Sequence, residues 1–306
     1  MMAFLISTFV GAAHGQPPLL VSDYPEAFKS NTLIVVGDGF PHGPKGSNSA
    51  TIDGLSAAWI AVRLAKYYEE PSVVLDTDIT RWHERTVDLL DDSHNLIVVG
   101  CHWVNVVSYY YLFMMPELVP VYPGNYKGDD PLVWPEFLIR KADGQRLAFW
   151  SDVEYKRNDY GLMLAIRDGE RNVLILWSYT EYATIAMAKM LENINLASDQ
   201  GWKLNSEAVL VIWKDAHDDD QVQLDEVTTQ PLFERAQETT YSYKQTVPTF
   251  TVTATRTVEH ILTATATSTY SAVSPWNVVL VLLGVIVAIA VVQVIRRSES
   301  AHRHES

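Results

Sequence analysis

Five short apolar runs are spaced along residues 30–214 of the chain, and each is four to six residues long. The runs are rich in β-branched residues and are followed by glycine or polar residues, a pattern typical of buried strands. They cover residues 32–37, 72–75, 95–100, 172–177 and 208–213. The spacing therefore predicts a sheet whose strands are separated by longer connections.

Two of these connections carry apolar residues at helical spacing. The first has apolar side chains at residues 52, 55, 59 and 62, with alanines between them. We expect Asn48 or Ser49 to cap this helix and Asp53 to lie in its first turn. The second covers residues 179–194, and Ser178 with Glu181 predicts a capping box at its start. Strands that alternate with helices favour an α/β fold with a mostly parallel sheet in three layers.

The segment from residue 119 to residue 171 has a different pattern. Prolines, glycines and aromatics alternate there with short β-prone pieces, among them residues 162–166. Turn residues at 142–144 and 168–169 predict hairpins. We therefore expect a β-rich insertion into the α/β domain.

The C-terminal part has the longest apolar stretch of the sequence. Residues 278–295 are apolar except for Gln293, and Arg296 and Arg297 follow at once. Eighteen helical residues span about 27 Å, close to the thickness of a bilayer core. Residues 276–297 are thus predicted to form one transmembrane helix, with residues 298–306 as a cytoplasmic tail.

The N-terminus resembles a secretory signal peptide over residues 1–15, although its first residues include no lysine or arginine. Together with the arginines at 296 and 297, it places an α/β domain of residues 16–222 outside the cell. Residues 223–275 lose apolar periodicity and are rich in alternating threonines. They are expected to form an extended stalk that suits O-linked sugars, so the localisation predicted is the cell surface, anchored in the membrane.

Charge and cysteine content limit the classes of function. The formal net charge is −14, which argues against a nucleic-acid partner because such proteins present a basic face. Cys101 is the single cysteine of the sequence, so no disulfide framework is expected within the chain.

Several segments, in order, resemble the archaeal S-layer protein domain. They are IVVGD (residues 34–38), NLIVVG with a following Val-Asn (residues 95–105), DYGLMLAI (residues 159–166) and the strand and helix of residues 172–191. Cys101-His102-Trp103 stands where that family usually has Gly-Pro. The resemblance implies a structural, non-enzymatic protein of a cell envelope, which belongs to an S-layer or is associated with one and has envelope proteins or its own copies as partners.

The glycine-rich loop of residues 38–49 follows a predicted strand and precedes a predicted helix, where α/β proteins bind ligands. Its glycines do not match a dinucleotide fingerprint, and Asp38 would repel a phosphate. A receptor for a small ligand at this loop is one alternative function.

A second alternative is a membrane-tethered cysteine hydrolase. His42 and Cys101 each follow an apolar strand, an order similar to that of caspase- and legumain-like peptidases, in which a histidine activates a thiol. A small buried side chain at a strand end is the simpler interpretation of Cys101.

Two further groups of residues have open interpretations. Asp215, Asp218, Asp219 and Asp220 could hold Ca²⁺ through carboxylate oxygens, or they could form a solvated acidic linker. An aromatic set could be core or a contact patch; it comprises Trp103, Tyr109, Tyr110, Tyr111, Phe113 and Trp134. His83, His94 and His102 lie near aspartates but show no metal-ligand spacing.

Overall fold

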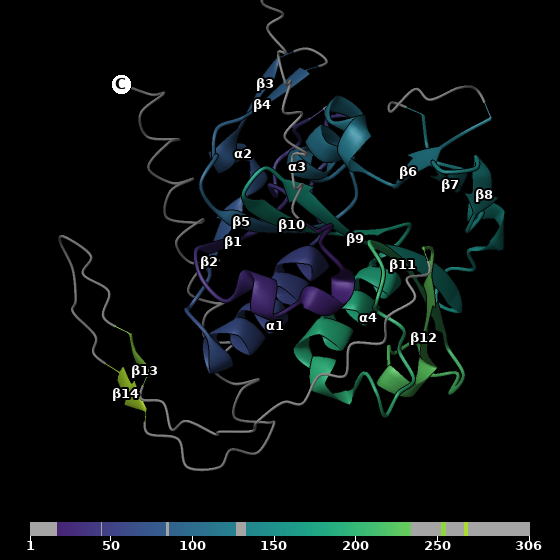
Figure 1. The fold of residues 1–306 in the computed structure, drawn as a ribbon. Coiled ribbons are helices and arrows are strands. Elements are labelled where there is room, and N and C mark those ends of the chain that lie inside the picture. Colours follow the sequence, from purple (N-terminus) through teal and green to yellow (C-terminus); the bar gives the residue numbers. More distant parts are fainter. Residues whose placement is uncertain are drawn as a thin grey trace, which may run out of the picture. The chain divides into compact units, whose positions relative to one another are not determined.

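The computed structural model describes residues 17–43, 45–83, 86–126, 133–233, 252–254 and 266–268. Its main element is a seven-stranded sheet in the order β12-β11-β9-β10-β5-β1-β2 (Figure 1). The strands are β1 (Thr32–Val36), β2 (Ser72–Leu75), β5 (Asn95–Val99), β9 (Asn158–Asp168), β10 (Arg171–Ser178), β11 (Ala208–Lys214) and β12 (Val227–Pro231). The five strands predicted from apolar runs are confirmed as β1, β2, β5, β10 and β11.

The sheet is mixed, so the prediction of a mostly parallel sheet is wrong. β1, β2, β5 and β10 pair in parallel, whereas β9 pairs antiparallel with both β10 and β11, and β12 pairs antiparallel with β11. The cause is a two-residue turn at Gly169 and Glu170, with Gly169 at φ +60°, which folds β9 directly back onto β10. Residues 162–166 therefore lie in the middle of the main sheet and not in an insertion.

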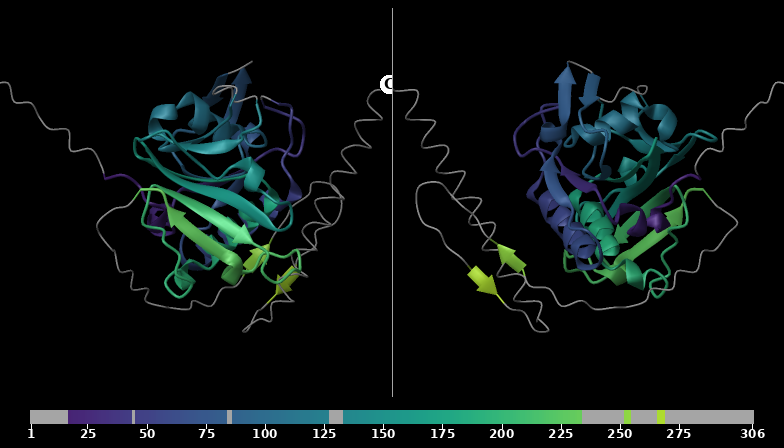
Figure 2. Two further views of the ribbon diagram at one scale, coloured as in Figure 1. Left: turned by 90° about the vertical axis from the view of Figure 1, so that its right-hand side faces the viewer. Right: turned by 60° about the vertical axis from the view of Figure 1, so that its left-hand side comes forward.

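Helices cover both faces of this sheet. α1 (Thr51–Tyr67) and α4 (Glu181–Glu192) pack side by side on one face, and Figure 2 shows them together under the strands. The opposite face carries α2 (Asp76–Ile79), α3 (Val106–Tyr109) and the π-helical turn Tyr110–Met114. Short 3₁₀ turns occur at Val21–Asp23, Glu26–Phe28, Pro116–Leu118, Trp150–Asp152, Ile194–Leu196 and Leu224–Glu226.

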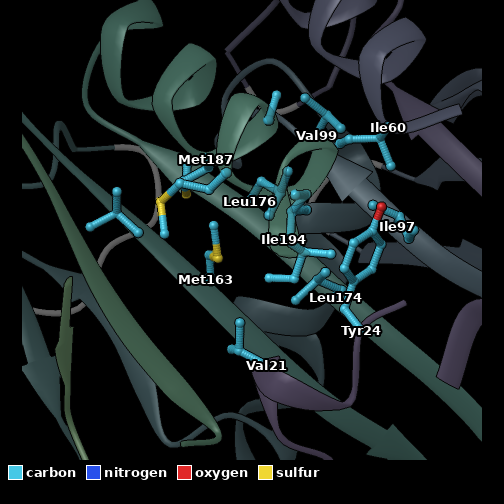
Figure 3. Packing of buried hydrophobic residues seen from close by; sticks show 14 of the residues in the cluster. Val21, Tyr24, Ile60, Ile97, Val99, Met163, Leu174, Leu176, Met187 and Ile194 are labelled. Carbon is cyan, nitrogen blue, oxygen red and sulfur yellow. The ribbon is translucent and has the colours of Figure 1, made fainter. Parts of the chain in front are cut away.

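Alternate side chains along the central strands point to opposite faces of the sheet and pack into two separate cores. Leu174 and Leu176 of β10 and Met163 of β9 point to the α1/α4 face, where they meet Ile60 and Met187 (Figure 3). All five side chains are fully buried. Burial of each contributes roughly 1.5–3 kcal/mol, so packing on this face holds α1 and α4 against the sheet.

Two small sheets extend the opposite face. β3 (Thr80–His83) and β4 (Thr86–Leu89) form a hairpin, and β6 (Val121–Gly124), β7 (Phe137–Arg140) and β8 (Gln145–Leu147) form an antiparallel sheet. The turn predicted at residues 142–144 is confirmed between β7 and β8, with Gly144 at φ +69°. The β-rich insertion thus exists, although it is shorter than expected.

The starts of both long helices differ from the predicted caps. Ala50 occupies the N-cap position of α1, and neither Asn48 nor Ser49 caps it. At α4 the N-cap is Thr180, whose hydroxyl accepts from the Tyr182 amide, while Asp159 of β9 accepts from the Ala183 amide at 2.8 Å. A carboxylate from another strand, invisible to local sequence rules, thus takes the place of the predicted capping box.

The chain divides into two compact units, residues 1–243 and 244–306. The first includes the main sheet, which continues through β12, beyond the boundary at residue 222 expected from composition. In the second, β13 (Val252–Ala254) and β14 (Ala266–Ser268) pair antiparallel, and the extended stalk expected over residues 223–275 stays a prediction.

The membrane predictions fall on other parts of the chain. Among the described residues, no helix has the length and apolar character needed to cross a membrane. The expected signal peptide (residues 1–15), transmembrane helix (276–297) and cytoplasmic tail (298–306) lie outside the described residues.

Candidate functional site

The carboxyl ends of β1, β2, β5 and β10 meet at one edge of the sheet, and the polar loops that follow them gather there. This edge is where α/β proteins place their ligands, because the loops and the first turns of the helices leave polar groups free to converge. The loop of residues 38–49, Asp76, Cys101 and Ser178 all lie at this edge.

Asp76, the first residue after β2, ties the loops together. Its carboxylate is fully buried and accepts hydrogen bonds from the backbone amides of Asp38 (2.9 Å), Thr77 (2.9 Å) and Val106 (2.6 Å). The ring of His42 adds a fourth contact at 2.8 Å. One carboxylate thus joins the ends of β1 and β2 to the start of α3.

His42 is fully engaged in these contacts. Nδ1 lies 2.7 Å from the Phe40 carbonyl and Nε2 lies 2.8 Å from the Asp76 carboxylate. Both partners are acceptors, so both ring nitrogens must donate, which favours the imidazolium form. The hydrogen bond to Asp76 is the main reason that the pKa of His42 is raised above its ordinary value. His42 therefore has no ring nitrogen left to take a proton from a thiol.

Cys101 lies after β5 and lines a pocket that His42 does not reach. Burial raises the pKa of the Cys101 thiol to about 11, so the thiol stays protonated and poorly nucleophilic near neutral pH. Within the described residues, no hydrogen bond or ion pair joins Cys101 to His42. The structure places the two residues of the hydrolase alternative at the same edge but does not assemble them into a nucleophile and its base.

The pocket has a volume of about 550 Å³. It lies between the loop before α1, the first turns of α1 and α4, and the ends of β5 and β10. Its lining comprises Gly46, Ser47, Asn48, Ala50, Ile52, Asp53, Gly100, Cys101, Trp103, Val104, Trp134, Ser178, Tyr179, Thr180, Glu181 and Thr184. The second half of the loop proposed from sequence as a ligand site thus forms one wall, and the first half is held by Asp76.

Asp53 is the most buried carboxylate of this lining, with 5% of its surface exposed. Its carboxylate accepts from the Ser49 hydroxyl at 2.7 Å, and no ion pair reaches it in the described part of the chain. Burial, with a smaller contribution from the charge of Glu181, raises the pKa of Asp53 to about 6. Asp53 therefore carries a charge near neutral pH at a site that penalises it.

This penalty predicts an unusual dependence of stability on pH. The folded pKa of Asp53 lies above its ordinary value of 3.8, so ionisation of Asp53 destabilises the folded protein. This destabilisation is absent below pH 4 and reaches its full size above about pH 6. Asp53→Asn should match the wild type at pH 4 and be about 2–3 kcal/mol more stable at pH 7, at ~1.4 kcal/mol per pKa unit. Urea denaturation of the full chain at both pH values measures this, with the exposed Asp199→Asn as control. An unchanged difference between pH 4 and pH 7 would contradict it.

Asn105 is a positioning residue that was not among the site residues predicted from the sequence. Its buried amide nitrogen donates to the carbonyls of Val35 (3.1 Å) and Val99 (3.0 Å), and its oxygen accepts from the Val107 amide. The side chain thus holds the ends of β1 and β5 together and caps α3. An asparagine just before an apolar segment is the only sequence signal for this role.

The acidic group of the calcium prediction is engaged in protein contacts. The buried carboxylate of Asp215 accepts from the amides of Asp219 and Asp220, Asp218 pairs with Arg157, and Asp220 pairs with Lys156 at 2.8 Å. Among described residues, no three His, Cys, Asp or Glu side chains are grouped to hold a metal ion. Calcium binding stays a prediction without geometric support.

The aromatic set divides between core and pocket. Tyr109 and Tyr111 are buried, while Tyr110 and Phe113 are partly buried at the edge of the core. Trp103 and Trp134 line the pocket, with ring centroids 4.5 Å apart and planes at 75°. His102 is buried and accepts from the Trp177 indole at 3.1 Å, and His83 and His94 pair with Asp88 and Asp91.

No model of a protein family matches the sequence, and no curated protein matches it. The geometry of the carboxyl edge is therefore the basis for the functional argument.

Proposed function

We propose that this chain is a non-enzymatic binding component of a cell envelope, and that the body built on its mixed seven-stranded sheet holds a ligand in the pocket at the carboxyl edge. The observation that carries the proposal is the pocket itself, which joins two helix starts and two strand ends that are distant in sequence. A cavity of this size with a few convergent polar groups is the usual form of a small-ligand site.

The chemistry around the pocket favours binding over catalysis. The Cys101 thiol is kept protonated by burial, and His42 is committed to Asp76 and Phe40. The two contacts of His42 hold the loops in a fixed arrangement, as preorganised binding sites require. The envelope location rests on the signal-like residues 1–15, the apolar residues 276–297 and the resemblance to archaeal S-layer proteins.

A structural role in a surface lattice is the second candidate, and the edge of the sheet favours it. β2 is the last strand of the sheet, and its outer edge has no strand partner among the described residues. Val73 and Leu75 of β2 and Val62 of the adjacent helix α1 are exposed by 48%, 37% and 56%. Unpaired edges with exposed aliphatic side chains are sites where another chain can add.

Filling the pocket tests the first candidate. Ala50 is exposed at the rim and caps α1 without a side-chain bond, so Ala50→Trp is expected to occupy the pocket without disturbing the core. We expect at least a tenfold loss of co-sedimentation with envelope fractions from the cells that make the protein. The control Ala142→Trp, in the exposed β7–β8 turn, should bind as the wild type does.

The same experiment separates the two candidates. If Ala50→Trp retains full binding to the envelope fractions, the pocket is not the binding site and the proposal fails. Retention of binding by that variant would favour contact through the β2 edge instead.

A further inference from the structure

We propose that the pocket binds an alkylammonium group, held between the Asp53 and Glu181 carboxylates and the faces of its aromatic walls. The inference rests on the proposed function in taking this pocket as the binding site, and it adds the chemical class of the ligand. It is argued from the charge, the walls and the hydrogen-bond donors of the pocket.

The lining is negatively charged, and Lys45, a cation beside it, lies over the ring of Trp103. Asp53 and Glu181 are its two ionisable carboxyl groups, and the pocket is lined by no lysine, arginine or histidine among the described residues. One oxygen of Glu181 accepts from the Tyr155 hydroxyl at 2.8 Å, and Asp53 has only neutral partners. Among the described residues no ion pair joins Asp53 or Glu181 to a cation, so a ligand cation would supply a counter-charge that these two carboxylates lack. A chain of net charge −14 also attracts cations from solution.

The walls include three aromatic residues. Trp103 and Trp134 are in edge-to-face contact, with their planes at 75°, and Tyr179 adds a third ring to the lining. A ring face that an ammonium group reaches would contribute cation–π attraction of about 0.5–2 kcal/mol. The ammonium of Lys45 lies 5.2 Å from the Trp103 ring centroid, so a ligand cation would contact another part of this ring or replace Lys45 there.

An anion is the competing ligand, because two helix starts border the pocket and helix N-termini attract anions. At α4, two donors are already used, because the amides of Tyr182 and Ala183 donate to Thr180 and Asp159. At α1, the Asp53 amide donates to the Ala50 carbonyl. The carboxylates of Asp53 and Glu181, which lie in the first turns of the two helices, present negative charge to the pocket and disfavour an anion there.

The titratable groups around Asp53 set the pH range for binding. Glu181 of α4, Cys101 after β5 and Tyr179 after β10 line the same pocket, and Ser49 of the loop donates to Asp53. Burial raises the pKa of Cys101 to about 11 and also raises that of Tyr179, so both stay neutral at physiological pH. With the pKa of Asp53 at about 6, its carboxylate is mostly ionised at pH 7.5 and mostly protonated at pH 5.

The test uses n-butylammonium as the probe and butan-1-ol as its neutral counterpart. Calorimetric titration of the full chain at constant ionic strength should show n-butylammonium binding at pH 7.5 at least tenfold more tightly than butan-1-ol. Asp53→Asn should weaken amine binding at least tenfold, and the wild type should lose about tenfold between pH 7.5 and pH 5. Asp199→Asn should bind as the wild type does. Choline and Nα-acetyl-lysine amide distinguish a quaternary ammonium from a lysine side chain as the source of the group.

The outcomes separate this inference from the proposed function. If Ala50→Trp loses envelope binding but n-butylammonium neither binds nor competes, the pocket is the site and the ligand class is wrong. If n-butylammonium binds and envelope binding survives Ala50→Trp, the proposed function is wrong and the amine site stands. Equal binding of butan-1-ol, or an unchanged affinity in a folded Asp53→Asn, overturns the inference.

Discussion

Gly37→Ala is expected to destabilise the body by about 3 kcal/mol or more. Overpacking usually costs about 1–3 kcal/mol, and the cost is higher where the atoms that clash cannot move. A Cβ at residue 37 would lie 1.7 Å from the carbonyl oxygen of Val104 and 2.8 Å from the carbonyl carbon of Val104. Both are backbone atoms of the loop after β5, so a side-chain rotation cannot relieve the clash. The loop would have to move away from the end of β1, and Cys101 and Trp103 of the pocket lining would move with it.

Urea denaturation of the full chain measures this effect. Gly39→Ala is the matched control in the same loop, because no atom lies within 4 Å of the position of its added Cβ. Its free energy of unfolding should stay within about 0.5 kcal/mol of the wild type. Equal stability of the two variants would show that the approach of Val104 to Gly37 is not a constraint on the fold.

Asp76→Ala is expected to cost about 3–5 kcal/mol, the range for removing one partner from a buried charged network. The substitution leaves the partly buried amides of Asp38 and Thr77 and the buried amide of Val106 without their acceptor, and it frees the ring of His42. Each orphaned donor costs about 1–3 kcal/mol, only partly recovered if water enters. The loops at the ends of β1 and β2 and the start of α3 should loosen together.

The midpoint of urea denaturation and the hydrogen-exchange rates of those three amides are the measurements. Asp78→Ala is the control, since Asp78 lies two residues away and accepts only from the Leu75 amide at 3.2 Å. Losing this cap should cost about 1 kcal/mol. A similar, small loss in both variants would mean that Asp76 does not organise the carboxyl edge.

Both predictions concern the support of the pocket and not its lining. Gly37 and Asp76 fix the positions of the loops, whereas Asp53 lies in the pocket and is expected to reduce stability near neutral pH. This contrast is typical of binding sites, where a group poised for a ligand is kept at a cost to the free protein. A variant that gains stability and loses amine binding, as expected of Asp53→Asn, would demonstrate it directly.

The sequence by itself determined the local elements. Apolar runs such as residues 32–37 and 95–100 are too short and too rich in β-branched residues to be helices, and the periodicity from residue 52 onwards cannot suit a strand. Turn chemistry located the β7–β8 and β9–β10 hairpins. The position of the loop of residues 38–49 between strand and helix is also a local property, and ligand binding there stays a prediction.

The tertiary structure alone decided which strands pair and which side chains meet. A run such as residues 162–166 is equally apolar in an insertion or in a central strand, and only its pairing with β10 and β11 placed it in the main sheet. Asp53 and Glu181 are distant in sequence and share a pocket because α1 and α4 pack together. Burial, which raises the pKa of Asp53 and keeps the Cys101 thiol protonated, depends on every segment packed around a residue, so the residue's own stretch of sequence does not contain it.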